Sequence, residues 1–169
     1  LTGIISTALK AGMVNEETAA KIASCMSTLN KKASELMQEV GVHACTDVTG
    51  FGLLGHACQI AENSQVGIKI YFASVPFFPE VEEFAKMGLC PGGLYSKEKS
   101  RLLEEQIAPQ VPQYMPDILF DAQTSGGLLI SLAPEAAQRL LDRLHDMGVP
   151  DATIIGEVLG RPTSRVLVE

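Results

Sequence analysis

A row of three potential metal ligands lies in a short predicted strand. Residues 42–47 alternate as a strand does, so His43, Cys45 and Asp47 project to one face and the residues between them to the other. Imidazole, thiolate and carboxylate groups are common protein ligands of metal ions. The row therefore indicates a metal site or, alternatively, a core histidine and a small buried thiol beside a strand end.

The predicted strand runs through a glycine-rich turn, residues 49–52, into a predicted helix. Asp47 then stands at a strand-to-helix junction with the hydroxyl of Thr49 and the free backbone N–H groups of a helix start near Gly50 and Gly52. Such a junction suits a metal-bound phosphate; the alternative is a tight connection only. The helix is predicted from an apolar stripe at steps of three and four residues, formed by Phe51, Leu54, Cys58 and Ala61.

Composition narrows the possible partners and surroundings. The chain has 169 residues, with 20 acidic and 13 basic side chains and a net charge of −7, which argues against a nucleic-acid or anionic membrane surface. No apolar run approaches the roughly 20 residues that span a bilayer. The four cysteines form no Cys-x-x-Cys pair and are expected to be reduced thiols. We therefore expect a soluble, cytoplasmic protein.

The length predicts one domain, residues 1–169, with one core. The chain opens on Leu1 without an initiator methionine and enters an apolar segment almost at once. We interpret it as a piece of a longer polypeptide.

The remaining segments predict helices and strands in alternation. Helices are expected over 4–11, from Asn15 to Val40 as one bent helix or two consecutive ones, over 79–87 and over 134–147, where His145 faces solvent. The segment 96–107 is helical in composition, and its Lys97, Lys99 and Arg101 either touch a phosphate or form a solvated face. Strands are expected over 66–72, 118–120, 128–132, 153–158 and 165–168.

A second polar turn, residues 121–127, lies between two of the predicted strands. It carries a carboxylate, Asp121, two hydroxyls and the pair Gly126-Gly127. The paired glycines either permit positive φ angles or allow another backbone or a ligand to approach closely.

Together these elements favour an α/β sandwich with a mixed sheet. The chain has no glycine fingerprint of a dinucleotide fold, no P-loop, no nucleophile elbow and no His-Glu-x-x-His motif. Composition and spacing alone thus stop at an α/β domain with a phosphate or metal site.

Three strings carry a more specific resemblance. The segment 43–56, the turn 121–127 and the Pro91-Gly92-Gly93 loop, together with 1–5 and 27–30, closely resemble the selenophosphate synthetase (selenide, water dikinase) family. The resemblance covers nearly the whole chain. It is to the C-terminal domain only, of the type shared with aminoimidazole ribonucleotide synthetase.

The resemblance implies a three-layer α/β/α domain and a reaction in which ATP, selenide and water yield selenophosphate, AMP and phosphate with Mg²⁺. In that family the catalytic Cys or selenocysteine, its lysine and most ATP-binding residues lie in an N-terminal domain. No catalytic residue is therefore expected here, and the family metal ligand that falls in this domain matches Asp47. Expected partners are the N-terminal ATP-binding domain and, in the full-length enzyme, a second copy in a homodimer.

One position departs from the family string. The family usually has proline where Ala122 stands here, and the loss of that proline frees the φ angle of the turn.

Two other functions are open. A related ATP-dependent purine-biosynthesis ligase would share the fold but lack the long matching strings. A non-catalytic assembly module would pair with another protein without metal or nucleotide.

Overall fold

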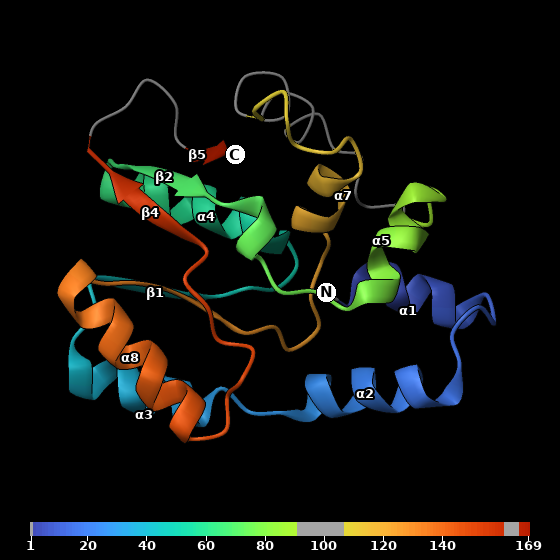
Figure 1. Ribbon diagram of the computed structural model, residues 1–169, viewed down its shortest axis with the longest axis horizontal. Coiled ribbons are helices and arrows are strands. Elements are labelled where there is room, and N and C mark those ends of the chain that lie inside the picture. The colour runs from blue at the N-terminus through green and yellow to red at the C-terminus, as the bar shows by residue number, and fades with distance from the viewer. Residues whose placement is uncertain (1, 91–106, 161–165) are drawn as a thin grey trace.

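The computed structural model describes residues 2–90, 107–160 and 166–169 (Figure 1). The helices within these ranges are α1 (Gly3–Lys10), α2 (Glu16–Ser27), α3 (Lys31–Val40), α4 (Gly52–Ser64), the 3-10 helix η1 (Phe72–Ser74), α5 (Pro79–Lys86), α7 (Met115–Leu119) and α8 (Pro134–Asp146). The strands are β1 (Ala44–Asp47), β2 (Gly67–Ile70), β3 (Leu128–Ser131), β4 (Gly156–Leu159) and β5 (Val166–Val168). No helix of these ranges is long and apolar enough to cross a membrane.

The strands form two sheets. β1 pairs antiparallel with β3, which sets Asp47 opposite Leu128. In the second sheet the order is β4-β2-β5, where β2 is antiparallel to β4 and parallel to β5. The predicted α/β class and mixed sheet are confirmed, and the mixed pairing is confined to the three-stranded sheet.

Helices pack against both sides of strand β3. Neighbouring residues of β3 point to opposite faces, so Leu129 packs against the main core, to which α4 contributes Leu53 and Leu54. Ile130 packs on the other side against a smaller cluster of Leu36 from α3 with Leu140 and Leu144 from α8. In Figure 1, α3 and α8 lie together on one side of β1 and α4 on the other, which gives an α/β/α order of layers.

The main core joins α1, α4, α5 and α7 to the three-stranded sheet. Its largest fully buried aliphatic side chains are Ile4, Ile5, Ile22, Ile70, Val81, Ile118, Leu119, Val166 and Val168. Two of these are consecutive residues of α1. Ile4 and Ile5 both have no exposed surface, so the start of the described chain is a buried part of the fold.

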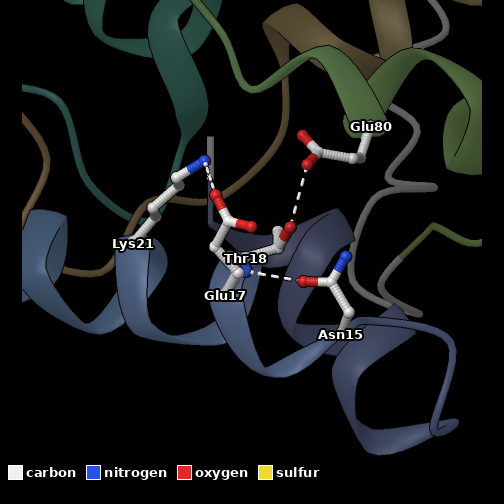
Figure 2. A network of polar contacts seen from close by, with 5 residues as sticks. All are labelled: Asn15, Glu17, Thr18, Lys21 and Glu80. Atoms are coloured by element: carbon white, nitrogen blue, oxygen red, sulfur yellow. Dashed lines mark hydrogen bonds and ion pairs between the residues drawn. The ribbon is translucent and has the colours of Figure 1, made fainter.

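Polar contacts connect α2 to α5 (Figure 2). Asn15 is the N-cap of α2, because its Oδ1 accepts the Thr18 N–H at 2.8 Å. The Thr18 hydroxyl then donates to Glu80 Oε1 at 2.9 Å, and Glu17 pairs with Lys21 at 2.8 Å. Asn15 thus marks the start of α2 by capping it, and Glu80 has a structural partner across the helix interface.

Two sequence predictions are wrong. The expected strand 118–120 is the end of helix α7, which starts with Pro116 in its first turn; a short apolar run fits a buried helix as well as a strand. Phe51 does not belong to the buried stripe of α4, because the helix begins at Gly52 and Phe51 is 63% exposed. Of the two alternatives for 15–40, the structure has two helices, separated by extended Thr28.

The other helices and strands predicted within the described residues are present with shifted ends. The segment 96–106, expected to be helical, lies outside the described residues. His145 is exposed as expected. The Pro91-Gly92-Gly93 loop and the basic residues Lys97, Lys99 and Arg101 lie outside the described residues.

The turn 121–127 packs directly against the end of β1. A Cβ atom on Gly126 would overlap the carbonyl oxygen of Val48, whereas a Cβ on Gly127 would meet nothing within 4 Å. Neither glycine has a positive φ angle. Of the two explanations for the glycine pair, close approach of another backbone therefore applies, and it applies at Gly126.

We expect Gly126→Ala to destabilise the chain by roughly 1–3 kcal/mol, because the new methyl group forces the turn away from Val48. Gly127→Ala is the matched control and should leave the stability nearly unchanged. Urea unfolding of both variants measures the difference. Equal stability of the two would contradict the close approach.

Loss of the α2 cap gives a second expectation. Asn15→Ala should lower the free energy of unfolding by about 1 kcal/mol, because the Thr18 N–H loses its acceptor. The control is Asn63→Ala, which removes the same side chain from an exposed position of α4 that is not a cap. A similar loss in both variants, measured by urea unfolding, would mean that the Asn15 contact adds nothing.

Candidate functional site

The three predicted ligands of β1 share an exposed face. His43, Cys45 and Asp47 are all exposed, and the alternate residues Ala44 and Thr46 are half-buried. The predicted alternation is therefore confirmed. In residues 2–90, 107–160 and 166–169, however, no group of three or more His, Cys, Asp or Glu side chains could hold a metal ion. Asp47 is an exposed carboxylate and not part of a closed metal site.

The thiol of Cys45 is not activated. Partial burial raises the pKa of Cys45, and the nearby carboxylate of Asp47 raises it further. Both effects disfavour the thiolate, which is the nucleophilic form. Cys45 is therefore not poised as a nucleophile.

Thr49 is the centre of the junction between β1 and α4. Its N–H donates to Nε2 of His56 at 3.0 Å, and its hydroxyl lies 3.2 Å from the same nitrogen. Its carbonyl oxygen accepts two N–H groups, from Gly52 at 3.1 Å and from Gln123 at 2.9 Å. Every polar group of Thr49 therefore has a partner within the chain.

The predicted phosphate-binding residues differ in how open they are. Gly52 has φ +67°, and a Cβ atom there would overlap the backbone carbonyl group of Phe120. Its N–H and that of Thr49 are both used inside the chain. Gly50 is exposed and has open space where a Cβ would stand. Gly50 is thus the member of the set that a ligand can approach without breaking an internal contact.

His56 is a site residue to which the sequence analysis gave no role. It is 6% exposed, and its ring meets that of Phe51 edge-on, with centroids 5.6 Å apart. Its Nδ1 is buried and has no hydrogen-bond partner in the described part of the chain. Its place in the sequence, three residues after Leu53 and four before Ile60, gave a signal, because that spacing puts it on an apolar helix face.

Asp121 is the second such residue, and its role is structural. The carboxylate is fully buried and accepts the N–H groups of Gly3 at 2.9 Å and Ile4 at 2.9 and 3.0 Å, at the start of α1. Burial raises the pKa of this carboxyl, and the hydrogen bonds from Ile4 and Gly3 act in the opposite direction. Asp121 is a helix cap here, and no metal can reach it without displacing α1.

The turn 121–127 also binds the first described residue and a third loop. Gln123 Oε1 accepts the Thr2 N–H at 2.9 Å, and the Thr124 N–H donates to the Thr2 hydroxyl at 2.7 Å. On its other side the Gly126 carbonyl accepts Nδ2 of Asn30 at 2.9 Å. We call the residues 28–30, 47–52 and 121–127 the loop cluster.

The loop cluster presents one carboxylate and two exposed apolar side chains. Asp47 is exposed near the open Gly50, and the hydroxyl residues Thr124 and Ser125 are also exposed. Leu29 and Phe51 are 78% and 63% exposed. One carboxylate is fewer than most metal sites use, so this surface can bind a metal ion only with ligands from elsewhere.

Comparison with known proteins gives relatives over most of the chain. It is 43% identical over 168 residues to a selenide, water dikinase of Pelobacter propionicus, covering 99% of this chain and 48% of that protein. It is 46% identical over 157 residues to a selenide, water dikinase of Caldanaerobacter subterraneus, covering 92% and 45%. The chain thus spans about half the length of these curated relatives.

Solved structures show the same fold at lower identity. A hydrogenase maturation protein HypE aligns with a TM-score of 0.59 and 24% identity, over 84% of this chain and 38% of that one. The same protein in complex with ATP aligns with a TM-score of 0.60 and 23% identity, over 84% and 37%. The likeness covers the arrangement of helices and sheets described above.

A family model matches residues 3–169, which include β1, the loop cluster and all the described helices. This chain therefore belongs to the family of AIR synthase related proteins, C-terminal domain.

Proposed function

We propose that this chain is the C-terminal domain of a selenide, water dikinase. The whole enzyme would convert ATP, selenide and water to selenophosphate, AMP and phosphate. The proposal is supported by the relatives of that name, at 37–46% identity over most of this chain. The alternative of a purine-biosynthesis ligase is not favoured by these relatives.

The observation that carries the proposal at the level of residues is the exposed Asp47 at the end of a rigidly bound strand. Its carboxylate suits Mg²⁺, which prefers oxygen ligands and is commonly bound by one or two carboxylates together with substrate phosphates. Mg²⁺ would neutralise charge that develops on the transferred phosphoryl group. The part of Asp47 is to hold the ion at the surface of the loop cluster, with the other ligands supplied by the rest of the protein.

The other residues of the loop cluster contribute by position. Gly50 lets a phosphate approach the backbone, while Thr49 and Gly52 maintain the turn in the vicinity of the phosphate. Exposed Leu29 and Phe51 give the cluster an apolar margin, which suits contact with an N-terminal ATP-binding domain. We further propose that the complete protein is a cytoplasmic homodimer.

Asp47→Asn tests the metal ligand. The substitution keeps the shape of the side chain and removes its charge, so in the intact protein selenophosphate formation should fall by about two orders of magnitude or more, while the melting temperature changes little. Asp151→Asn is the matched control, because Asp151 is exposed and lies outside the loop cluster. Near-normal turnover by the Asp47 variant would show that this carboxylate is not a ligand.

The chain by itself should be inactive. We expect the purified 169 residues to form no AMP from ATP in the presence of selenide and Mg²⁺, because one carboxylate cannot assemble the metal site. Adding the separately produced N-terminal half should restore AMP formation. Activity of the chain alone would overturn the proposed division between the two halves.

A further inference from the structure

The contact between His56 and Thr49 fixes the proton of the imidazole. Nε2 accepts the Thr49 N–H at 3.0 Å, so that nitrogen carries no proton. The neutral ring is then the Nδ1–H tautomer, and the Thr49 hydroxyl, at 3.2 Å, donates to the same Nε2. Nε2 of His56 thus faces both donors of Thr49, the backbone N–H and the hydroxyl.

The need for a histidine at this position does not come from stability. Nδ1 is buried with no partner among the described residues, and an unpaired buried donor costs free energy. An aliphatic side chain of similar size would fill the same space without that cost. What an aliphatic side chain cannot supply is the acceptor for Thr49.

That acceptor acts on the turn that presents Asp47. Thr49 is two residues beyond Asp47, and its carbonyl oxygen accepts N–H groups from Gly52 of α4 and from Gln123 of the turn 121–127. His56 accepts the Thr49 N–H, so both peptide groups that flank Thr49 are hydrogen-bonded. Its backbone cannot rotate unless hydrogen bonds to α4 or to the turn 121–127 are broken.

We infer that His56 is a positioning residue that sets the direction of the Asp47 carboxylate through Thr49 without touching a ligand. This rests on the proposed role of Asp47 as a metal ligand. Groups that hydrogen-bond to metal ligands and orient them contribute to metal affinity, and their removal typically weakens metal binding by 10- to 100-fold. Here the group acts through a backbone peptide.

The test compares three variants of the intact protein. His56→Leu fills the space but has no acceptor, whereas His56→Gln can place its amide oxygen near the position of Nε2. Leu140→Val, in the small cluster between α3 and α8, is the control that loosens packing away from the loop cluster. Hydrogen exchange is measured over residues 46–58 of each variant. Binding of Mn²⁺, which serves as the probe for the metal site, is measured by electron paramagnetic resonance.

We expect His56→Leu to exchange faster at Thr49 and to bind Mn²⁺ roughly tenfold more weakly, with little change in melting temperature. His56→Gln should restore most of both properties, and Leu140→Val should alter neither. Unchanged exchange and Mn²⁺ affinity in His56→Leu would overturn the inference. Equal losses in the Leu and Gln variants would also overturn it, since only packing would then matter.

The two proposals fail in different ways. If the unaltered protein forms no selenophosphate, the proposed function is wrong, but exchange at Thr49 still reports whether His56 fixes the turn. If His56→Leu leaves Thr49 protected, the positioning role is wrong even where Asp47→Asn abolishes activity.

Discussion

The close packing of two backbone turns is the constraint on which the rest of the site depends. The turn 121–127 lies against the end of β1, and only a residue without a Cβ atom fits at Gly126 beside the Val48 carbonyl. On the neighbouring side, Gly52 allows the start of α4 to lie against Phe120. With both contacts made, Thr49 is close enough to Gln123 for a hydrogen bond, and the strand end becomes fixed.

A buried carboxylate extends this arrangement to the first described helix. Asp121 caps α1 from within the core, and Gln123 binds Thr2 next to it. The same short turn therefore holds the beginning of α1 on one side and the Asp47 turn on the other.

The exposed and the buried residues of the site have different roles. Asp47 and Gly50 face outward and are open to a ligand, whereas Thr49, the Nε2 atom of His56 and the Asp121 carboxylate make internal hydrogen bonds. A single outward carboxylate is a weak metal site by itself, because Mg²⁺ loses little by staying hydrated. If Asp47 binds Mg²⁺ as we propose, a carboxylate that is already held in place leaves little ordering to be done when the other ligands arrive.

Much of the fold was readable from the sequence, because the helices carry local signals. α2 begins at the cap Asn15, and α8 has Pro134 in its first turn and Gly148 just beyond its end. That His43, Cys45 and Asp47 share one face of β1 was predicted for the same reason, since alternation in a strand is a local property. The apolar run before Asp121 was misread, because a few apolar residues fit a helix or a strand equally well.

By itself, then, the sequence determined the local elements and the residue types at the junction after β1. Only the tertiary structure decided that Gly126 serves a close approach, that Asp121 caps a helix 118 residues away and that His56 binds Thr49. These roles depend on which groups meet in space, and a buried polar group takes whichever partner packing brings to it. The spacing of residues along the chain does not show which partner a buried polar group will have.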